Sequence, residues 1–258
     1  MTAYRALAGA FIRSRLAYRA SFVARVLAVA LADLAPILLI GIVLTRFPSV
    51  AGWRWPELAL LYGLMQTAAA IARTLSVPLD HFDDVIVSGE LDVILTRPLS
   101  PLGHVLAGGL EIMHAGRIGV GIAAMAVAFR AAGVPATAAN LALTAAAVAG
   151  GALILFALTL IVASFSFWAG RTGKLQDIIM ASARSYAEYP LVIFPRGIRA
   201  ALTVVLPVAL ASYYPALRLL GRDHGILSFA ALPMGIAFLG LALLLWRLGI
   251  RRYHSTGS

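Results

Sequence analysis

Long apolar runs separated by short polar breaks make up most of the chain. Because a helix needs about 20 apolar residues to cross the hydrocarbon core of a bilayer, each run is a candidate membrane span. Prolines, glycines and arginines mark the breaks between them. The candidate spans are 22–45, 56–78, 106–129, 139–169, 175–194, 198–217 and 226–248.

Arginines at the two ends of the chain limit how many of these runs cross. They are Arg5, Arg13, Arg15 and Arg19 near the N-terminus, and Arg247, Arg251 and Arg252 near the C-terminus. Cationic residues beside spans favour the cytoplasmic side, so both termini are predicted to be cytoplasmic. Both ends inside requires an even number of crossings, and therefore one of the seven runs does not cross.

The run 198–217 is the better candidate for the segment that does not cross. Pro207 and Pro215 interrupt it, and broken backbone at membrane depth is tolerated only where protein or water covers it. We expect 175–194 to cross and a re-entrant hairpin to lie within an external region, 195–225; the reverse assignment is the alternative. The predicted fold is an all-α polytopic membrane protein with six transmembrane helices in one domain, 1–258, and an interfacial helix over 1–20.

The loop 79–103 between the second and third spans is polar and predicted to be cytoplasmic. Its apolar residues follow a helical spacing up to Ser88–Gly89, with Asp80, Asp83 and Asp84 at the start of the helix, where anions complement the helix dipole. A second short helix follows and ends at Arg97–Pro98. Two short amphipathic helices bent at a glycine suit docking into a groove of another protein; a solvated connection is the alternative. The predicted docking residues are Phe82, Val85, Ile86, Gly89, Leu91, Asp92, Leu95 and Arg97.

Composition excludes most other classes of protein. Hydrophobic residues make up 61% of the chain and charged residues 12%, about half the share in a soluble domain. The net charge of +10 comes from residues at the ends of apolar runs, and no basic patch interleaved with aromatics suggests nucleic acid. There is no cysteine, and the fragment Gly173-Lys174-Leu175 lacks the Ser or Thr of a phosphate-binding loop. We therefore expect no cofactor, metal or catalytic site in this chain.

Ionisable residues inside the spans are candidates for a polar pathway or for contacts between helices. They are Asp33, Glu111, His114, Arg117, Arg184 and Glu188. None of the residues one turn from Asp33 can pair with it, so its partner is expected on another helix, with Arg117 or Arg184 as candidates. Glu111, His114 and Arg117 share one helical stripe, which is either a charged lining of the cytoplasmic entrance or an intrahelical pairing. Arg184 and Glu188 can neutralise one another at i, i+4.

Two motifs resemble those of the membrane subunits of a bacterial ABC exporter family of the ABC-2 type. The first is carried by Gly89, Leu91, Asp92, Leu95, Arg97, Pro98, Leu99, Pro101 and Leu102. The second is carried by Tyr189, Pro190, Ile193, Phe194, Pro195, Ser212, Tyr213, Tyr214, Pro215 and Ala216. The order of spans agrees with that family over nearly the whole chain.

The resemblance implies a permease subunit in the bacterial cytoplasmic membrane. It implies a second permease, identical or related, and a dimer of cytoplasmic ATPase subunits that bind ATP and Mg and dock on 79–103. The main alternative is a self-contained secondary transporter coupled to protons through Asp33 or Glu111, although no inverted repeat supports it. A membrane enzyme or assembly scaffold is a third possibility, with no catalytic constellation behind it.

Overall fold

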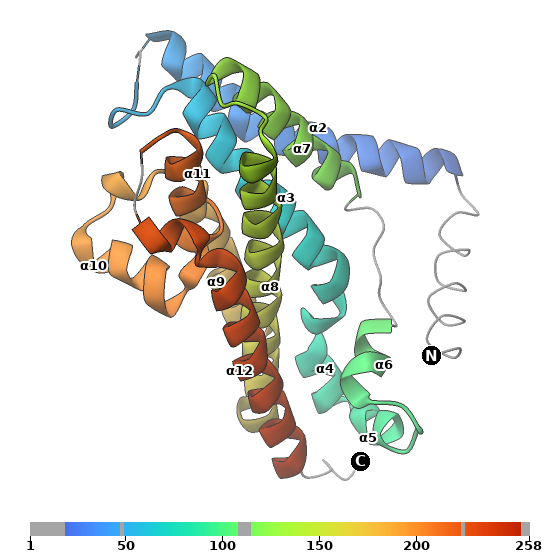
Figure 1. The fold of residues 1–258 in the computed structure, drawn as a ribbon. Helices are drawn as coiled ribbons and strands as arrows, with labels where there is room; N and C mark the ends of the chain where they lie inside the picture. The colour runs from blue at the N-terminus through green and yellow to red at the C-terminus, as the bar shows by residue number, and fades with distance from the viewer. Residues whose placement is uncertain (1–18, 47–48, 108–114, 223–224, 254–258) are drawn as a thin grey trace.

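The computed structural model describes residues 19–46, 49–107, 115–222 and 225–253. Every regular element in these ranges is helical, so the all-α prediction is confirmed (Figure 1). The interfacial helix predicted over 1–20 falls almost entirely outside the described residues. The longer helices are α2 (Arg19–Arg46), α3 (Trp55–Ser76), α7 (Ala115–Ala131), α8 (Ala138–Ala169), α9 (Gly173–Ala187) and α12 (Ala231–Arg252).

Shorter helical pieces fill two regions between the long helices. After α3 come η1 (Val77–Leu79), α4 (Phe82–Val87), α5 (Glu90–Leu95) and α6 (Pro101–Ala107). Between α9 and α12 come η3 (Leu191–Ile193), α10 (Arg196–Ala200), η4 (Ala201–Val205), η5 (Pro207–Leu210), α11 (Tyr213–Leu219) and η6 (Gly225–Phe229).

Three stretches of the described chain are long and apolar enough to cross a membrane. They are Trp55–Val87, Ala138–Ala169 and Ala231–Arg252, and the bent pair Arg196–Val205 and Pro207–Leu219 would make a fourth if it were one span. The predicted count of six is therefore not confirmed by length and composition. Helix α9 has 15 residues, and at 1.5 Å per residue it is about 22 Å long, shorter than the hydrocarbon core of about 30 Å.

The segment 198–217 is bent, as its prolines predicted. Its two arms meet at an angle of 76°, with Leu206 between η4 and Pro207 at the start of η5. Pro215 does not interrupt α11, because it is the third residue of that helix, where a missing backbone N–H is tolerated. The bend thus coincides with Leu206 and Pro207 rather than with Pro215.

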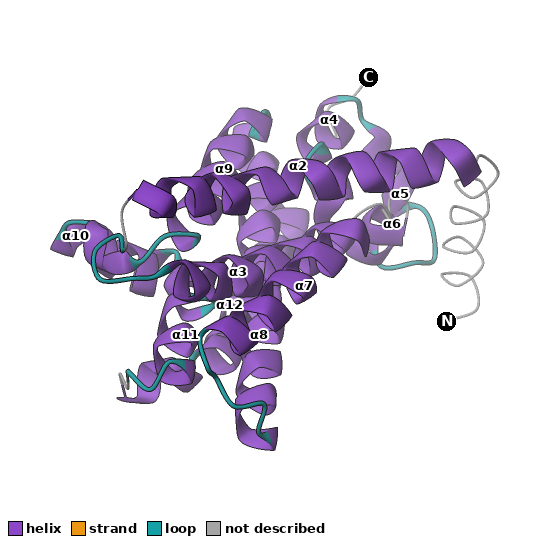
Figure 2. Ribbon diagram, turned by 90° about the horizontal axis from the view of Figure 1, so that it is seen from above, coloured by secondary structure: helices purple, strands orange, loops and turns teal. Residues whose placement is uncertain are grey.

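Helix α3 is the centre of the bundle. In the stretch Trp55–Val87, which contains α3, 78% of the most apolar 18 residues are buried inside the protein; in α12 the corresponding share is 22%. Helix α3 runs antiparallel to α7 with close backbone approach, since a Cβ built on Gly63 would lie 2.9 Å from the Met125 nitrogen and one on Gly121 equally close to the Thr67 nitrogen. Figure 2 shows α2 as a long helix beside α7. The uncovered apolar surface of α12 is what a lipid-facing helix presents.

Helices α8 and α12 lie side by side and run in the same direction (Figure 1). A Cβ on Gly235 would lie 2.7 Å from the Gly150 carbonyl oxygen, and one on Gly249 would collide with the Phe167 ring. Small residues at such crossings let membrane helices pack through their backbones. Because the two helices are parallel, the chain must return between them, and α9 makes that return.

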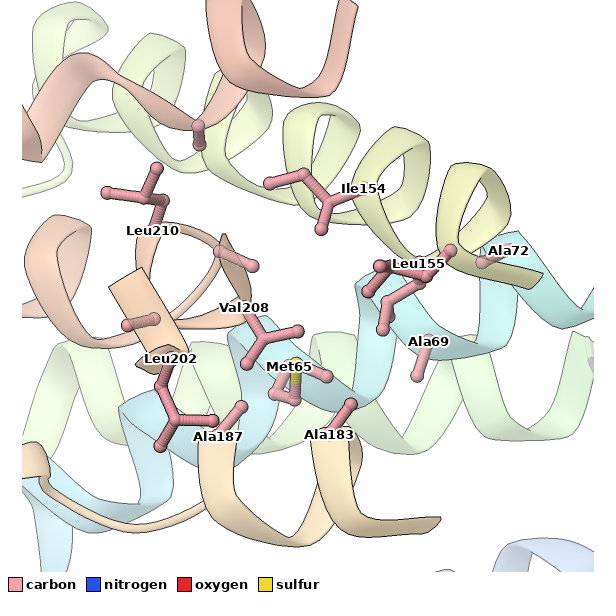
Figure 3. Packing of buried hydrophobic residues seen from close by; sticks show 14 of the residues in the cluster. Met65, Ala69, Ala72, Ile154, Leu155, Ala183, Ala187, Leu202, Val208 and Leu210 are labelled. Carbon is pink, nitrogen blue, oxygen red and sulfur yellow. The ribbon is translucent and has the colours of Figure 1, made fainter. Parts of the chain in front are cut away.

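The bent segment is packed into the bundle rather than standing apart from it. Figure 3 shows Val208 and Leu202 against Met65 of α3, Leu155 of α8 and Ala183 of α9. All five side chains are buried. The core therefore joins α3, α8, α9 and the bent pair into one unit.

Candidate functional site

Residues 79–103 form a group of short helices beyond the end of α3, here called the docking module (Figure 1). Helix α4 ends at Val87 and α5 begins at Glu90, and Gly89 between them has φ +75°. That left-handed conformation is strained for residues with a Cβ, which explains the glycine. The predicted pair of short helices with a bend at Gly89 is confirmed.

The apolar side of the docking module packs against its own chain. Phe82 is fully buried, with its ring centroid 5.3 Å from that of Phe167 and 4.7 Å from that of Trp246. Ile86 and Leu91 are buried in the same cluster. The prediction that these three residues contact a partner must be corrected, because an amphipathic pattern shows that a face is buried without showing what buries it.

Other apolar side chains of the docking module remain exposed. Val93 is 55% exposed, Val87 43% and Leu95 40%. Of the other predicted docking residues, Val85, Gly89 and Asp92 are half-buried. Arg97 is exposed, with its Nη1 3.3 Å from Nε2 of His104. The apolar residues exposed on the docking module thus include Val87 and Val93, which were not predicted to dock. They do not include Phe82, Ile86 and Leu91, which were.

Asp80, just before α4, and Asp83, within it, both contact α9. The Asp83 carboxylate oxygen Oδ2 accepts the backbone N–H groups of Thr172 at 3.0 Å and Gly173 at 2.8 Å, at the start of α9. Asp80 accepts a hydrogen bond from Nε2 of Gln176 at 2.7 Å and pairs with Arg73 at 2.5 Å. Asp83 was predicted to complement the dipole of its own helix. In addition, it contacts Thr172, 89 residues away in sequence, at the start of α9.

An ion pair that is buried on its Asp33 side joins α2 to α7. The Arg117 Nε lies 2.9 Å from Oδ2 of Asp33, and Asp33 is buried. The Tyr62 hydroxyl of α3 also donates to the Asp33 backbone carbonyl. Of the two candidate partners predicted for Asp33, the structure thus has Arg117.

The remaining candidate polar residues are less informative. Glu111 and His114 lie outside the described residues, as does the side chain of Arg184. Glu188 is half-buried at the C-terminal end of α9. The charged stripe predicted on the third span can therefore be followed only at Arg117.

A cavity of about 230 Å³ lies where α3, α7, α8 and α9 meet. Its lining combines small and apolar side chains with a few polar ones: Ala69, Ala72, Arg73, Ser76, Arg117, Leu155, Thr159, Asp177, Met180 and Ala181. The Ser76 hydroxyl is buried without a hydrogen-bond partner among the described residues. Both Arg117 and Arg73 are engaged by carboxylates, so the cavity adjoins each of the two acidic contacts just described.

The second motif lies at the opposite end of α3 from the docking module. Tyr213 packs its ring 5.6 Å from that of Trp53, close to where α3 begins. Beside it, the buried Glu57 pairs with Arg222 at 2.8 Å. Sequence analysis missed this pair, which spans 165 residues; Glu57 also accepts hydrogen bonds from the backbone N–H and the side chain of Arg54, three residues earlier.

No group of three residues that could hold a metal ion occurs within the described part of the chain. Comparison with known families gives the decisive finding: residues 30–257 match the family described as ABC-2 family transporter protein. The chain belongs to the ABC-2 transporter family. No curated protein and no solved structure matches it.

Membership of the ABC-2 family makes the chain a membrane permease of an ABC transporter, a multi-pass membrane protein that works with ABC ATPase subunits. The apolar helices agree with that assignment.

Proposed function

We propose that this ABC-2 permease is one half of the translocation pathway of an ATP-driven exporter, completed by a second permease that is identical or related. The observation that carries the proposal is the docking module beside a family match over residues 30–257. The sequence has no phosphate-binding loop, so ATP and Mg belong to a dimer of ATPase subunits outside this chain.

The exposed apolar residues of the docking module are the proposed contact with the ATPase. Val87, Val93 and Leu95 stand beside the bend at Gly89, and the buried Phe82 fixes the helices that carry them. An apolar face on short helices suits a groove of another protein. The buried base supports this role because a rigid mount transmits a push better than a mobile loop.

The proposed topology has six passes, with both termini in the cytoplasm of a bacterial cell. The first pass would be α2; of the other five, α3, α8 and α12 run toward the docking module, and α7 and α9 run back. Helix α9 and the turn η3 together cover Gly173–Ile193, enough to cross if the intervening residues contribute. The end of α12, with Arg251 and Arg252, lies at the end of the bundle that carries the docking module, as the positive-inside rule favours (Figure 1).

Purification from the native host tests the ATPase assignment. We expect the tagged full-length chain to bring down an ATPase whose hydrolysis is absent from the permease alone. Homogeneous permease that hydrolyses ATP by itself, or that brings down no ATPase from native membranes, contradicts the proposal.

Cysteine labelling tests the sidedness, because the chain has no native cysteine. We expect a cysteine at position 226, where Ile226 is exposed in η6, to react with a membrane-impermeant maleimide in intact cells. A cysteine at position 84, exposed on α4, should react only after permeabilisation. The opposite labelling pattern contradicts the proposed topology.

A further inference from the structure

Helix α9 begins against a carboxylate from the docking module. Thr172 precedes its first turn and makes no capping hydrogen bond with its own side chain. The two backbone N–H groups there donate to Asp83 instead, at 3.0 and 2.8 Å. Because the first N–H groups of a helix have no partner inside it and carry partial positive charge, a carboxylate is the favourable acceptor.

The surroundings of this contact make it selective and strong. Asp83 is buried, and a Cβ on Gly173 would lie only 3.2 Å from its Oδ2, so a side chain at 173 would crowd the carboxylate. Gln176, one turn into α9, is buried and donates to Asp80 at 2.7 Å. Charge-assisted hydrogen bonds of this kind are roughly twice as strong as neutral ones.

The far end of α9 reaches the bent segment. Ala183 and Ala187 lie in the core with Leu202 and Val208. The Ser212 hydroxyl donates to the Ala187 carbonyl at 2.7 Å. Between these contacts, Asp177 and Met180 form part of the cavity wall. One helix therefore connects the docking module, the cavity and the bent segment.

We infer that Asp83 is a positioning residue for transport, through which movement of the docking module is passed to α9 and so to the cavity wall and the bent segment. This inference rests on the proposed docking of an ATPase. Phe82 joins α4 to α8 and α12 through ring contacts, whereas the adjacent Asp83 joins α4 to α9. Without this carboxylate, the first backbone N–H groups of α9 lose their acceptor, and the bond from Gln176 to Asp80 is left to join the docking module to α9.

The test uses the permease in complex with its co-purified ATPase in lipid nanodiscs. A cysteine replaces Ile178, which is 65% exposed on α9, and carries an environment-sensitive fluorophore. ATP with Mg should shift its emission. In Asp83→Ala we expect the ATPase to remain bound and active while the shift falls at least fivefold. Asp83→Asn, which keeps an acceptor oxygen without the charge, should give an intermediate shift.

Asp84→Ala is the matched control. Asp84 is the next residue on α4, its side chain is exposed, and its contact with the exposed Arg171 is long, at 3.8 Å. This variant should leave the shift unchanged. A wild-type shift in Asp83→Ala overturns the inference, and so does loss of ATPase binding, which would make Asp83 a docking residue. If Asp83→Ala does not fold, a wild-type shift in folded Asp83→Asn overturns it instead.

Failure of this inference is distinguishable from failure of the proposed function. A wild-type complex that hydrolyses ATP without any shift at position 178 refutes only the role of α9 and Asp83. Absence of any ATPase bound to the wild-type chain refutes the proposed function itself.

Discussion

The two faces of the docking module should respond in opposite ways to substitution. Phe82 is fully buried against Phe167 and Trp246. Truncating a buried Phe to Ala typically costs about 3–5 kcal/mol of stability. Because whole domains are stable by only about 5–15 kcal/mol, Phe82→Ala should lower the unfolding temperature markedly and yield less folded permease.

Val93→Asp should behave differently, since Val93 is 55% exposed in the isolated chain. Surface substitutions usually change stability by no more than about 0.5 kcal/mol. In the docked complex the loss combines part of the roughly 1.5–3 kcal/mol of burying a Val with about 2 kcal/mol or more for an unpaired buried polar group. A total of about 3 kcal/mol corresponds to roughly a hundredfold weaker ATPase binding.

Thermal unfolding in detergent and capture of the ATPase on immobilised permease separate the two effects. We expect Phe82→Ala to be unstable, with its folded fraction still able to bind, and Val93→Asp to be stable but unable to bind. Val93→Ala controls for charge and should bind several-fold more weakly than wild type. Normal ATPase capture by folded Val93→Asp would refute the proposed contact surface.

Three other outcomes follow from contacts described above. Asp33→Ala should lower the free energy of unfolding by about 2–4 kcal/mol by leaving Arg117 unpaired, and Asp33→Leu combined with Arg117→Leu should regain most of it; additive losses in that double-mutant cycle would contradict the pairing. Gly235→Val should destabilise the permease by about 1–3 kcal/mol, since its Cβ would lie 2.7 Å from the Gly150 carbonyl, whereas Gly240→Val, with open space at its Cβ, should not; equal unfolding temperatures would argue against close packing of α8 and α12. Purified permease alone should neither bind nor hydrolyse ATP, and isothermal calorimetry that detects binding would contradict this.

Local signals in the sequence predicted the local structure well. The spacing of apolar residues and the glycine at 89 gave the two short helices and the bend between them, because each depends on neighbouring residues only. Asp33 had no polar neighbour within a turn, and the expected partner on another helix is present in Arg117. In both cases, elementary geometry and the cost of burying a charge were sufficient.

Contacts between distant segments could not be predicted in the same way. Nothing in the amphipathic pattern around Phe82 distinguishes a groove in a partner from the aromatic rings of α8 and α12. Asp83 was predicted to act on its own helix only. Its second contact could not be predicted, because the partner, Gly173, lies 90 residues further along the chain. The predicted length of the span 175–194 was wrong for a different reason. Helix α9 has only 15 residues, and hydropathy alone does not determine where a helix ends.

The length of α8 has a consequence for where the ATPase can sit. The helix has 32 residues, about 48 Å at 1.5 Å each, which exceeds the hydrocarbon core of about 30 Å by roughly 18 Å. The core that holds Phe82 includes Ala157, Leu160 and Ala163, in the C-terminal half of that helix. With the N-terminus of α8 at one edge of the hydrocarbon core, this contact would lie near the level where a crossing of about 30 Å ends, and an ATPase on the proposed docking surface would then sit beside the lipid headgroups.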